Sequence, residues 1–396
     1  MKKIILAVGA RPNFMKAAPL FYELDKCPFA DPILVHTGQH YDFNMSQAFF
    51  SDFDLPEPAF NLEVGSGSHA EQTGNILIRF DSVLEETRPD MVIVFGDVNS
   101  TIACSLSAKK THIPVAHVEA GLRSRDRSMP EEINRILTDC ISDILFTHCE
   151  DANDNLSEEG IRSVDWKKIM VDRSNFQFDS PVALNVGNVM IDSLVKILSR
   201  IDASYVQTVL HKLGAFDSDS SVRKPPFGLV TLHRPFNVDS ELNLRGILDV
   251  LNTISDRLIL LFPVHPRTEM KISKLSPPFK RNKKFILTQP LGYREFVALE
   301  KEATLVITDS GGIQEETSYM KVPCLTLRPN TERPVTISEG TNRMVSIDTL
   351  ADEVDRILSG GQFGPGRDIS LWDGQAARRM TDVLKLYFES DVLSLH

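Results

Sequence analysis

Short, almost continuously apolar runs recur along the chain, and each is followed by a segment with helical spacing. The runs are rich in Val, Ile and Leu, which is typical of strands buried on both faces of a parallel sheet. In the first half they are KIILAVGA (3–10), PILVHTG (32–38), MVIVFGD (91–97), PVAHVEA (114–120) and DILFTHC (143–149). Candidate helices between them cover residues 14–25, 69–87, 99–111 and 131–141. This alternation predicts an α/β fold with a doubly wound parallel sheet.

The same alternation restarts in the second half of the chain. The strand-like runs there are GLVTLH (228–233), LILLFPVH (258–265), KFILTQP (284–290), ATLVITDS (303–310) and VPCLTLR (322–328). A chain of 396 residues also exceeds the size at which one hydrophobic core usually keeps growing. The sequence therefore predicts two Rossmann-like doubly wound domains that face each other across a cleft.

We expect the boundary between the two domains near residue 184. The N-terminal domain would cover residues 1–184, and the C-terminal domain would cover residues 185–373. The final segment, about 374–396, begins with apolar side chains at helical spacing, which predicts a closing helix that packs back onto the N-terminal domain. Residues 160–183 fit neither a strand period nor a helix period, so we expect an extended connection there.

Composition and charge exclude several classes of function. The formal net charge of −11 argues against a nucleic-acid partner, because such proteins need a basic footprint. No apolar run approaches the length of about 18 residues that a membrane span needs, and Arg11-Pro12 interrupts the N-terminal run before a signal peptide could end. The five cysteines contain no Cys-x-x-Cys pair, which argues against a zinc ribbon or a disulfide framework. We expect a cytoplasmic protein with neither a membrane nor a nucleic-acid partner.

Polar side chains follow the expected strands of the first half, where ligands bind in open α/β sheets. They are Arg11, Asn13, Lys16, Gln39, His40, Asp97, Asn99, Glu119 and Arg123. Three carboxylates, Asp97, Glu119 and Glu131, come with the cations Lys16 and Arg135. Such a set could remove a weakly acidic proton, return one and steady a departing anion. The alternative is an ion-pair network with no catalytic role.

A second candidate site lies at the turn Ser310-Gly311-Gly312 of the second half. The turn leads directly into an expected helix, whose N-terminal N–H groups attract anions, and glycine lets a phosphate come close. A carboxylate one turn later, Glu315 or Glu316, suits the hydroxyls of a ribose. A nucleotide ligand is therefore predicted, although the turn could also be only a tight connection. No Gly-x-Gly-x-x-Gly or Walker lysine motif is present, and no His-Glu-x-x-His, so NAD, ATP and metal sites are not expected.

Ten motifs occur in the order of a known family. They are GARPNFMK (9–16), HTGQHYD (36–42), FGDVNST (95–101), HVEAGLRS (117–124), MPEEINR (129–135), GNVMID (187–192), TLHRP (231–235), FPVHPRT (262–268), TDSGGIQEE (308–316) and TERP (331–334). On these motifs the chain resembles the non-hydrolysing UDP-N-acetylglucosamine 2-epimerases over nearly its whole length. The resemblance implies the fold of the B-type glycosyltransferases, with the active site in the interdomain cleft.

The resemblance also implies an activity and a set of site residues. The family interconverts UDP-N-acetylglucosamine and UDP-N-acetylmannosamine without NAD or any other cofactor, by eliminating UDP to give 2-acetamidoglucal and adding UDP back. By motif, the catalytic residues would be Asp97, Glu119 and Glu131, supported by Lys16, Arg135 and His233. The UDP contacts would be Arg11, Ser310, Gly311, Gly312, Glu316 and Arg333. The expected partners are the UDP-sugar substrate and a second copy of the chain in a homodimer.

Three departures from the family pattern bear on the substrate and on regulation. Asn13-Phe14 stands where a common form of the first motif has Glu-Ala or Glu-Ile, and Phe236 replaces the Glu of an HRxEN form. QHYDFNM differs from the QHxxM form of allosterically activated enzymes, so we do not expect such activation. A 2-epimerase acting on UDP-N-acetylgalactosamine or another 2-acetamido sugar nucleotide is an alternative. A retaining UDP-sugar glycosyltransferase, a hydrolysing epimerase and a silent sugar-nucleotide sensor are further alternatives.

Overall fold

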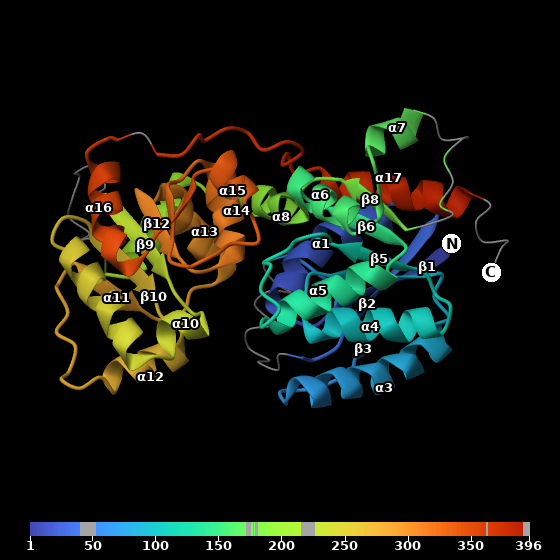
Figure 1. The fold of residues 1–396 in the computed structure, drawn as a ribbon, viewed down its shortest axis with the longest axis horizontal. Helices are drawn as coiled ribbons and strands as arrows, with labels where there is room; N and C mark the ends of the chain where they lie inside the picture. The colour runs from blue at the N-terminus through green and yellow to red at the C-terminus, as the bar shows by residue number, and fades with distance from the viewer. Residues whose placement is uncertain are drawn as a thin grey trace. The chain divides into compact units, whose positions relative to one another are not determined.

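The computed structural model describes residues 1–39, 53–171, 176, 178, 181–214, 226–361 and 363–390. The chain divides into two compact units, one of Met1–Ser193 with Ser370–His396 and one of Leu194–Ile369. Each unit contains one sheet in which all strand pairs are parallel, and helices alternate with the strands along the chain (Figure 1). The predicted α/β class, with two doubly wound parallel sheets, is confirmed.

The first sheet has the strand order β3-β2-β1-β4-β5-β6-β8-β7. Its strands are β1 (Lys2–Val8), β2 (Ala30–His36), β3 (Phe60–Asn61), β4 (Met91–Phe95), β5 (Val115–Val118), β6 (Ile144–Thr147), β7 (Arg162–Val164) and β8 (Val182–Asn185). Its central strand β1 pairs on both sides, so that Ile5 lies opposite Ile33 of β2 and Val92 of β4. A strand enclosed in this way is apolar at nearly every position, which explains the continuous apolar run that marks it in the sequence.

The helices of the first unit cover both faces of this sheet. They are α1 (Arg11–Asp25), α3 (His69–Thr87), α4 (Asn99–Lys110), α5 (Pro130–Ile141), α6 (Glu150–Glu158), α7 (Trp166–Val171), the start of α8 (Val189–Leu198) and α17 (Ala376–Glu389). Ile76 and Phe80 of α3 pack with Ile5 and Val92 in one buried cluster. Because side chains alternate along a strand, Ile4 and Leu6 are buried on the opposite face.

The segment 160–183 is not the extended connection that we expected. It contains β7 and α7, and it leads into β8, which lies between β6 and β7 in the sheet. β7 is an edge strand of three residues, and its Arg162 and Ser163 are exposed. An edge strand this short needs no apolar run, which is why the periodicity did not reveal it.

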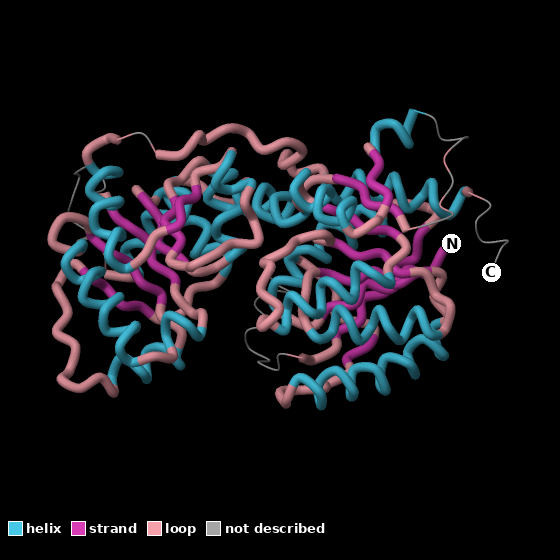
Figure 2. Tube along the Cα trace, in the orientation of Figure 1, coloured by secondary structure: helices cyan, strands magenta, loops and turns pink. Residues whose placement is uncertain are grey.

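The second sheet has the strand order β11-β10-β9-β12-β13-β14. Its strands are β9 (Phe227–Thr231), β10 (Ile259–Pro263), β11 (Phe285–Thr288), β12 (Leu305–Thr308), β13 (Cys324–Thr326) and β14 (Asn342–Met344). The helices of this unit are α9 (Ala203–Lys212), α10 (Pro235–Val238), α11 (Glu241–Ile254), α12 (Pro266–Ser273), α13 (Tyr293–Glu302), α14 (Gly311–Met320), α15 (Val335–Ser338) and α16 (Ile347–Leu358). Figure 2 shows the strands of each unit as an inner layer between helices. None of the described helices is long and apolar enough to cross a bilayer.

The C-terminal segment belongs to the first unit, and hydrogen bonds from α8 and β6 hold it there. Asp192 of α8 accepts hydrogen bonds from the backbone N–H groups of Ala376 (3.1 Å) and Ala377 (2.8 Å) at the start of α17. The indole of Trp372 donates to the carbonyl oxygen of His148 at 2.8 Å. The first unit therefore extends into α8, beyond the boundary that we expected at residue 184.

Gly187, just after β8, lies against the returning segment. Its φ is +84°, and a Cβ there would lie 2.1 Å from the carbonyl oxygen of Leu371. Gly160 is a matched control, since its φ is +85° and nothing lies within 4 Å of its added Cβ. We expect Gly160→Ala to lower the free energy of unfolding by about 1 kcal/mol through backbone strain. Gly187→Ala should lower it by roughly 1–3 kcal/mol more, because the added carbon also clashes. Urea unfolding checks both values, and equal losses would contradict the close approach.

Candidate functional site

The strand order of the first sheet reverses direction between β1 and β4, which makes their carboxyl ends the expected binding region. Asn13 joins the two ends. Its Oδ1 accepts hydrogen bonds from the N–H groups of Gly9 (3.1 Å) and Ala10 (3.0 Å), and its Nδ2 donates to the carbonyl oxygen of Phe95 (2.9 Å). This buried amide fixes the turn into α1, the helix that carries Lys16. The side chain of Arg11 and the whole of His40 lie outside the described residues.

Lys16 and Glu119 form a buried ion pair at this edge of the sheet. Glu119 follows β5 with φ +70°, a left-handed conformation that is unfavourable for a residue with a side chain. Gly96 follows the neighbouring strand β4, and a Cβ there would lie 3.1 Å from both Glu119 Oε2 and Lys16 Nζ. Backbone strain of this kind persists only where the surroundings impose it, and it is frequent at functional sites.

Asp97 and Arg135 form a second ion pair, one residue after Gly96. The side chain of Asp97 is 30% exposed, whereas that of Arg135 is 2% exposed. Arg135 also binds the buried carboxylate of Glu132, which accepts the N–H groups of Ser124 (2.9 Å) and Arg125 (3.0 Å). Glu132 therefore holds Arg135 in place, and Asp97 is the solvent-facing partner.

Glu131 occupies the first turn of α5 and is half-buried. Within the described residues, no hydrogen bond or ion pair joins its side chain to Asp97, Glu119 or Lys16. Asn134 of the same helix donates to the carbonyl oxygen of Asp97 at 3.0 Å, so α5 does reach the end of β4. Four of the five predicted charged residues of the first unit thus form two ion pairs at neighbouring strand ends, and Glu131 lies outside both pairs.

A buried network that the sequence interpretation missed supports these strand ends. Nε2 of His117 hydrogen-bonds to the carbonyl oxygen of Gly96 (2.8 Å), and its Nδ1 hydrogen-bonds to Asp139 (2.7 Å). Asp139 also accepts hydrogen bonds from Arg123 (2.7 Å) and from the N–H of Gly121 (3.1 Å). Burial alone would raise the pKa of Asp139, but the charges of His117 and Arg123 outweigh it and lower the pKa. The network fixes the carbonyl just before Asp97.

In the second unit the strand order reverses between β9 and β12, and Asp309 joins these two strand ends. Its fully buried carboxylate accepts the N–H groups of His233 (3.0 Å) and Arg234 (2.9 Å) and the side-chain amide of Asn237 (3.0 Å). The ring of His233 is 51% exposed, and its Nδ1 lies 3.2 Å from Asp309. Asp309 thus places His233 at the carboxyl edge of the second sheet.

The turn Ser310-Gly311-Gly312 begins α14, as the sequence predicts, and Arg333 lies over it. A Cβ on Gly311 would come within 2.5 Å of Nη1 of Arg333, so only glycine allows this approach. The side chain of Ser310 makes no capping hydrogen bond to the helix. A guanidinium beside a helix N-terminus combines two positive potentials, which is suited to a phosphate.

Two buried carboxylates hold Arg333 in this position. Its Nε donates to Glu315 at 2.8 Å, and its Nη1 lies 3.0 Å from Glu332. Burial alone would raise the pKa of Glu332, but the charges of Arg333 and Arg328 dominate and lower the pKa far below its ordinary range. Of the two carboxylates considered for a ribose, Glu315 therefore binds Arg333. Glu316 accepts a hydrogen bond from the hydroxyl of Tyr293 at 2.7 Å.

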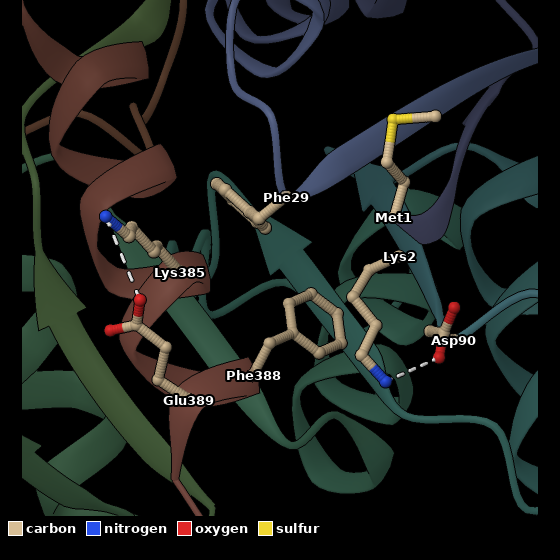
Figure 3. A pocket seen from close by; sticks show the side chains of 7 residues that line it. All are labelled: Met1, Lys2, Phe29, Asp90, Lys385, Phe388 and Glu389. Atoms are coloured by element: carbon tan, nitrogen blue, oxygen red, sulfur yellow. Dashed lines mark hydrogen bonds and ion pairs between the residues drawn. The ribbon is translucent and has the colours of Figure 1, made fainter.

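The first unit also contains a surface hollow, which lies away from the strand-end residues of its own sheet. It is lined by Met1, Lys2, Phe29, Asp90 and the end of α17 (Figure 3). Lys2 begins β1, and Phe29 and Asp90 directly precede β2 and β4, so the hollow lies at the amino edge of the sheet. Ligands of open α/β sheets bind at the opposite edge. Among the described residues, no three His, Cys, Asp or Glu side chains gather in a way that could hold a metal ion.

Known proteins are similar to this chain in both sequence and fold. A family model described as UDP-N-acetylglucosamine 2-epimerase matches residues 22–385. A UDP-N-acetylglucosamine 2-epimerase of Methanocaldococcus jannaschii is 42% identical over 87% of this chain and 88% of its own. A UDP-2,3-diacetamido-2,3-dideoxy-D-glucuronate 2-epimerase of Pseudomonas aeruginosa is 36% identical over 96% of this chain and 99% of its own.

A solved structure of the M. jannaschii UDP-GlcNAc 2-epimerase, in complex with UDP-GlcNAc and UDP, superposes with a TM-score of 0.80. That chain is 37% identical to this one, and the match covers 97% of this chain and 99% of the other.

Replacing Asp139 should test the buried network. We expect Asp139→Asn to lower the free energy of unfolding at pH 7 by about 3–5 kcal/mol, because it leaves buried positive charge without its partner. The folded pKa of Asp139 lies below the unfolded value, so its contribution is present above the unfolded pKa and is lost as pH falls. Urea unfolding should therefore show a smaller difference between variant and wild type at acid pH. Asp154→Asn, an exposed position on α6, is the control. A pH-independent difference would contradict the assignment.

Proposed function

Because the chain belongs to the UDP-N-acetylglucosamine 2-epimerase family, we propose that it interconverts UDP-N-acetylglucosamine and UDP-N-acetylmannosamine. As a member of this family it is an isomerase. Two ion pairs at neighbouring strand ends of the first sheet carry the proposal. Lys16 pairs with Glu119, and Asp97 pairs with Arg135. Inversion at C2 requires a base and an acid, and these pairs support the assignment because they place carboxylates beside cations that would stabilise a departing anion.

The reaction that we propose proceeds through an alkene. A carboxylate removes the C2 proton, the electrons of the C2–H bond form a double bond to C1, and the C1–O bond breaks so that UDP leaves. UDP then adds back to C1 of the resulting 2-acetamidoglucal, while an acid delivers a proton to the opposite face of C2. Asp97, Glu119 and Glu131 are the carboxylates to which we assign these proton transfers.

The second unit supplies the nucleotide site in this proposal. The N–H groups of Ser310, Gly311 and Gly312 and the guanidinium of Arg333 would hold the diphosphate, and a helix N-terminus supports such a role. We assign Arg11 and His233 to the same anion and Glu316 to the ribose. The departing UDP carries negative charge, and fixed positive groups would stabilise it between elimination and re-addition.

A second candidate substrate class is favoured by one relative and one residue. The P. aeruginosa relative is named for a 2,3-diacetamido-glucuronate sugar nucleotide. Phe236, at the start of α10, is 66% exposed. It stands where the HRxEN form of the family motif has Glu, and we expect this difference to affect binding of the sugar. UDP-N-acetylgalactosamine and acceptor-dependent glycosyl transfer remain further hypotheses. Proton NMR in D2O with each sugar nucleotide separates them, since only a 2-epimerase places deuterium at C2 of a new sugar nucleotide.

We also propose that the protein forms a homodimer in the cytoplasm. The outward face of α5 exposes Ile133 and Leu137, and a second copy that covered them would bury apolar surface. The five cysteines are all free thiols, which suits a reducing compartment. Sedimentation equilibrium tests the dimer, and a monomer at micromolar concentration would rule it out.

Asp97→Asn should abolish turnover while leaving the affinity for UDP largely intact. The amide keeps the shape and a hydrogen bond of the carboxylate but cannot take a proton. We expect deuterium incorporation at C2 to fall by at least about 100-fold, the lower range for loss of a general base. The measurement is NMR in D2O together with calorimetric titration of UDP. Asp352→Asn, exposed on α16, is the control, and a near-normal rate for Asp97→Asn would remove the assigned role.

Arg333→Ala should weaken UDP binding by roughly 10–100-fold, because a hydrogen bond from a charged donor to a phosphate is lost. Arg333→Lys keeps the charge but loses the simultaneous contacts with Glu315 and Glu332, so we expect an intermediate affinity. Arg356→Ala, an exposed arginine on α16, is the control for net charge. Calorimetric titration of UDP measures all three variants. If Arg333→Ala binds UDP like the wild type, Arg333 does not belong to the nucleotide site.

A further inference from the structure

Two buried carboxyl groups meet where α13 packs against α14. Glu300 of α13 is completely buried and Glu316 of α14 is 2% exposed. No N–H or hydroxyl donor among the described residues reaches either oxygen of Glu300. The charge of Glu316 acts on Glu300, and the Glu316 carboxylate accepts the hydroxyl of Tyr293 at 2.7 Å. A hydrogen bond between two carboxyl groups needs a proton on one of them.

The neutral form is favoured at Glu300 rather than at Glu316, because no donor among the described residues reaches Glu300 whereas Glu316 accepts the hydroxyl of Tyr293. Burial, and then the charge of Glu316, raise the pKa of Glu300 well above its ordinary value. Cys324 of β13 also lies near Glu300, and burial raises the pKa of that thiol to about 12. Neither neighbour supplies a positive charge that would favour a second carboxylate. A neutral Glu300 carboxyl has a hydroxyl that can donate a hydrogen bond to the carboxylate of Glu316.

We propose that Glu300 is a positioning residue for nucleotide binding. Its carboxylic acid and the hydroxyl of Tyr293 fix the Glu316 carboxylate in the second turn of α14, where that carboxylate accepts hydrogen bonds from the ribose hydroxyls of UDP. A carboxylate that is already oriented loses little side-chain freedom when the ligand binds. This inference rests on the proposed function and deepens it, because it explains how the ribose-binding group is held.

Two substitutions separate the hydrogen bond from the packing. Glu300→Gln keeps the shape and an N–H donor toward Glu316, so we expect it to bind UDP within about twofold of the wild type. Glu300→Met fills a similar volume without a donor, and we expect about tenfold weaker binding for the loss of one hydrogen bond to a charged group. Circular dichroism confirms that each variant is folded before titration. Unchanged affinity in Glu300→Met would overturn the proposal.

A change in the ligand tests whether the effect reaches the ribose. With 2′,3′-dideoxy-UDP, which lacks both hydroxyls, Glu300→Met and the wild type should bind equally. A residue that only stabilises the fold would weaken both ligands by the same factor. An equal loss for UDP and its dideoxy analogue would therefore overturn the proposal.

The shared proton also predicts a dependence on pH. As pH rises and Glu300 loses its proton, the wild type should lose affinity for UDP, whereas Glu300→Gln should not. The ratio of the two dissociation constants at each pH removes the effect of titrating UDP itself. In the folded protein Glu300 keeps a proton that the unfolded chain releases near pH 4.3, so the wild type loses stability as pH rises above that value. Glu300→Gln should consequently raise the melting temperature more at pH 9 than at pH 5. A ratio and a melting difference that do not change with pH would overturn the assignment.

Titration of the wild type and of Arg333→Ala shows whether the nucleotide site or only the role of Glu300 is wrong. If the wild type does not bind UDP, the nucleotide site and the inference fall together. If the wild type binds UDP, Arg333→Ala does not, and both Glu300 variants match the wild type, only the role of Glu300 is overturned.

Discussion

In each unit, one buried polar side chain joins two strand ends at the point where the strand order reverses. Asn13 joins the end of β1 to that of β4, and Asp309 joins the end of β12 to that of β9. At such a point the connections that follow two neighbouring parallel strands run to opposite sides of the sheet and leave backbone groups without ladder partners. Each bridge satisfies these groups, and the residues beside it, Lys16 in one unit and His233 in the other, gain a fixed position.

Among the described cations of the candidate site, Lys16, Arg135 and Arg333 are each held by carboxylates. Several of these carboxylates have no role assigned in substrate binding. Glu132 holds Arg135, and Glu315 and Glu332 hold Arg333. Removing charges from water is costly, so a buried guanidinium needs partners on more than one side. This arrangement fixes the direction of the cation in advance, and electrostatic stabilisation of a departing anion depends on such preorganisation.

The internal strands other than β8 could be predicted from sequence, because burial on both faces makes them continuously apolar. The edge strands β3, β7 and β14, of two or three residues, carry no such signal. Charged residues at strand ends were visible, but their partners depend on tertiary packing. One signal was overlooked: Glu132, Arg135 and Asp139 lie at i, i+3 and i+7, so they share one face of α5. That spacing would have placed Glu132 in the interior beside Arg135.

Helix α5 therefore has the opposite distribution of side chains to an ordinary surface helix: charged residues are buried and apolar residues are exposed. Its buried face carries Glu132, Arg135 and Asp139, whereas Ile133 and Leu137 are exposed on another face. Apolar burial contributes little to holding such a helix, so its position depends on the ion pairs that it makes with the strand ends. In the homodimer that we propose, a second copy on the exposed face would add the missing apolar burial. The same contact would then steady Arg135, and with it Asp97, so that assembly and catalytic geometry would be coupled through one helix.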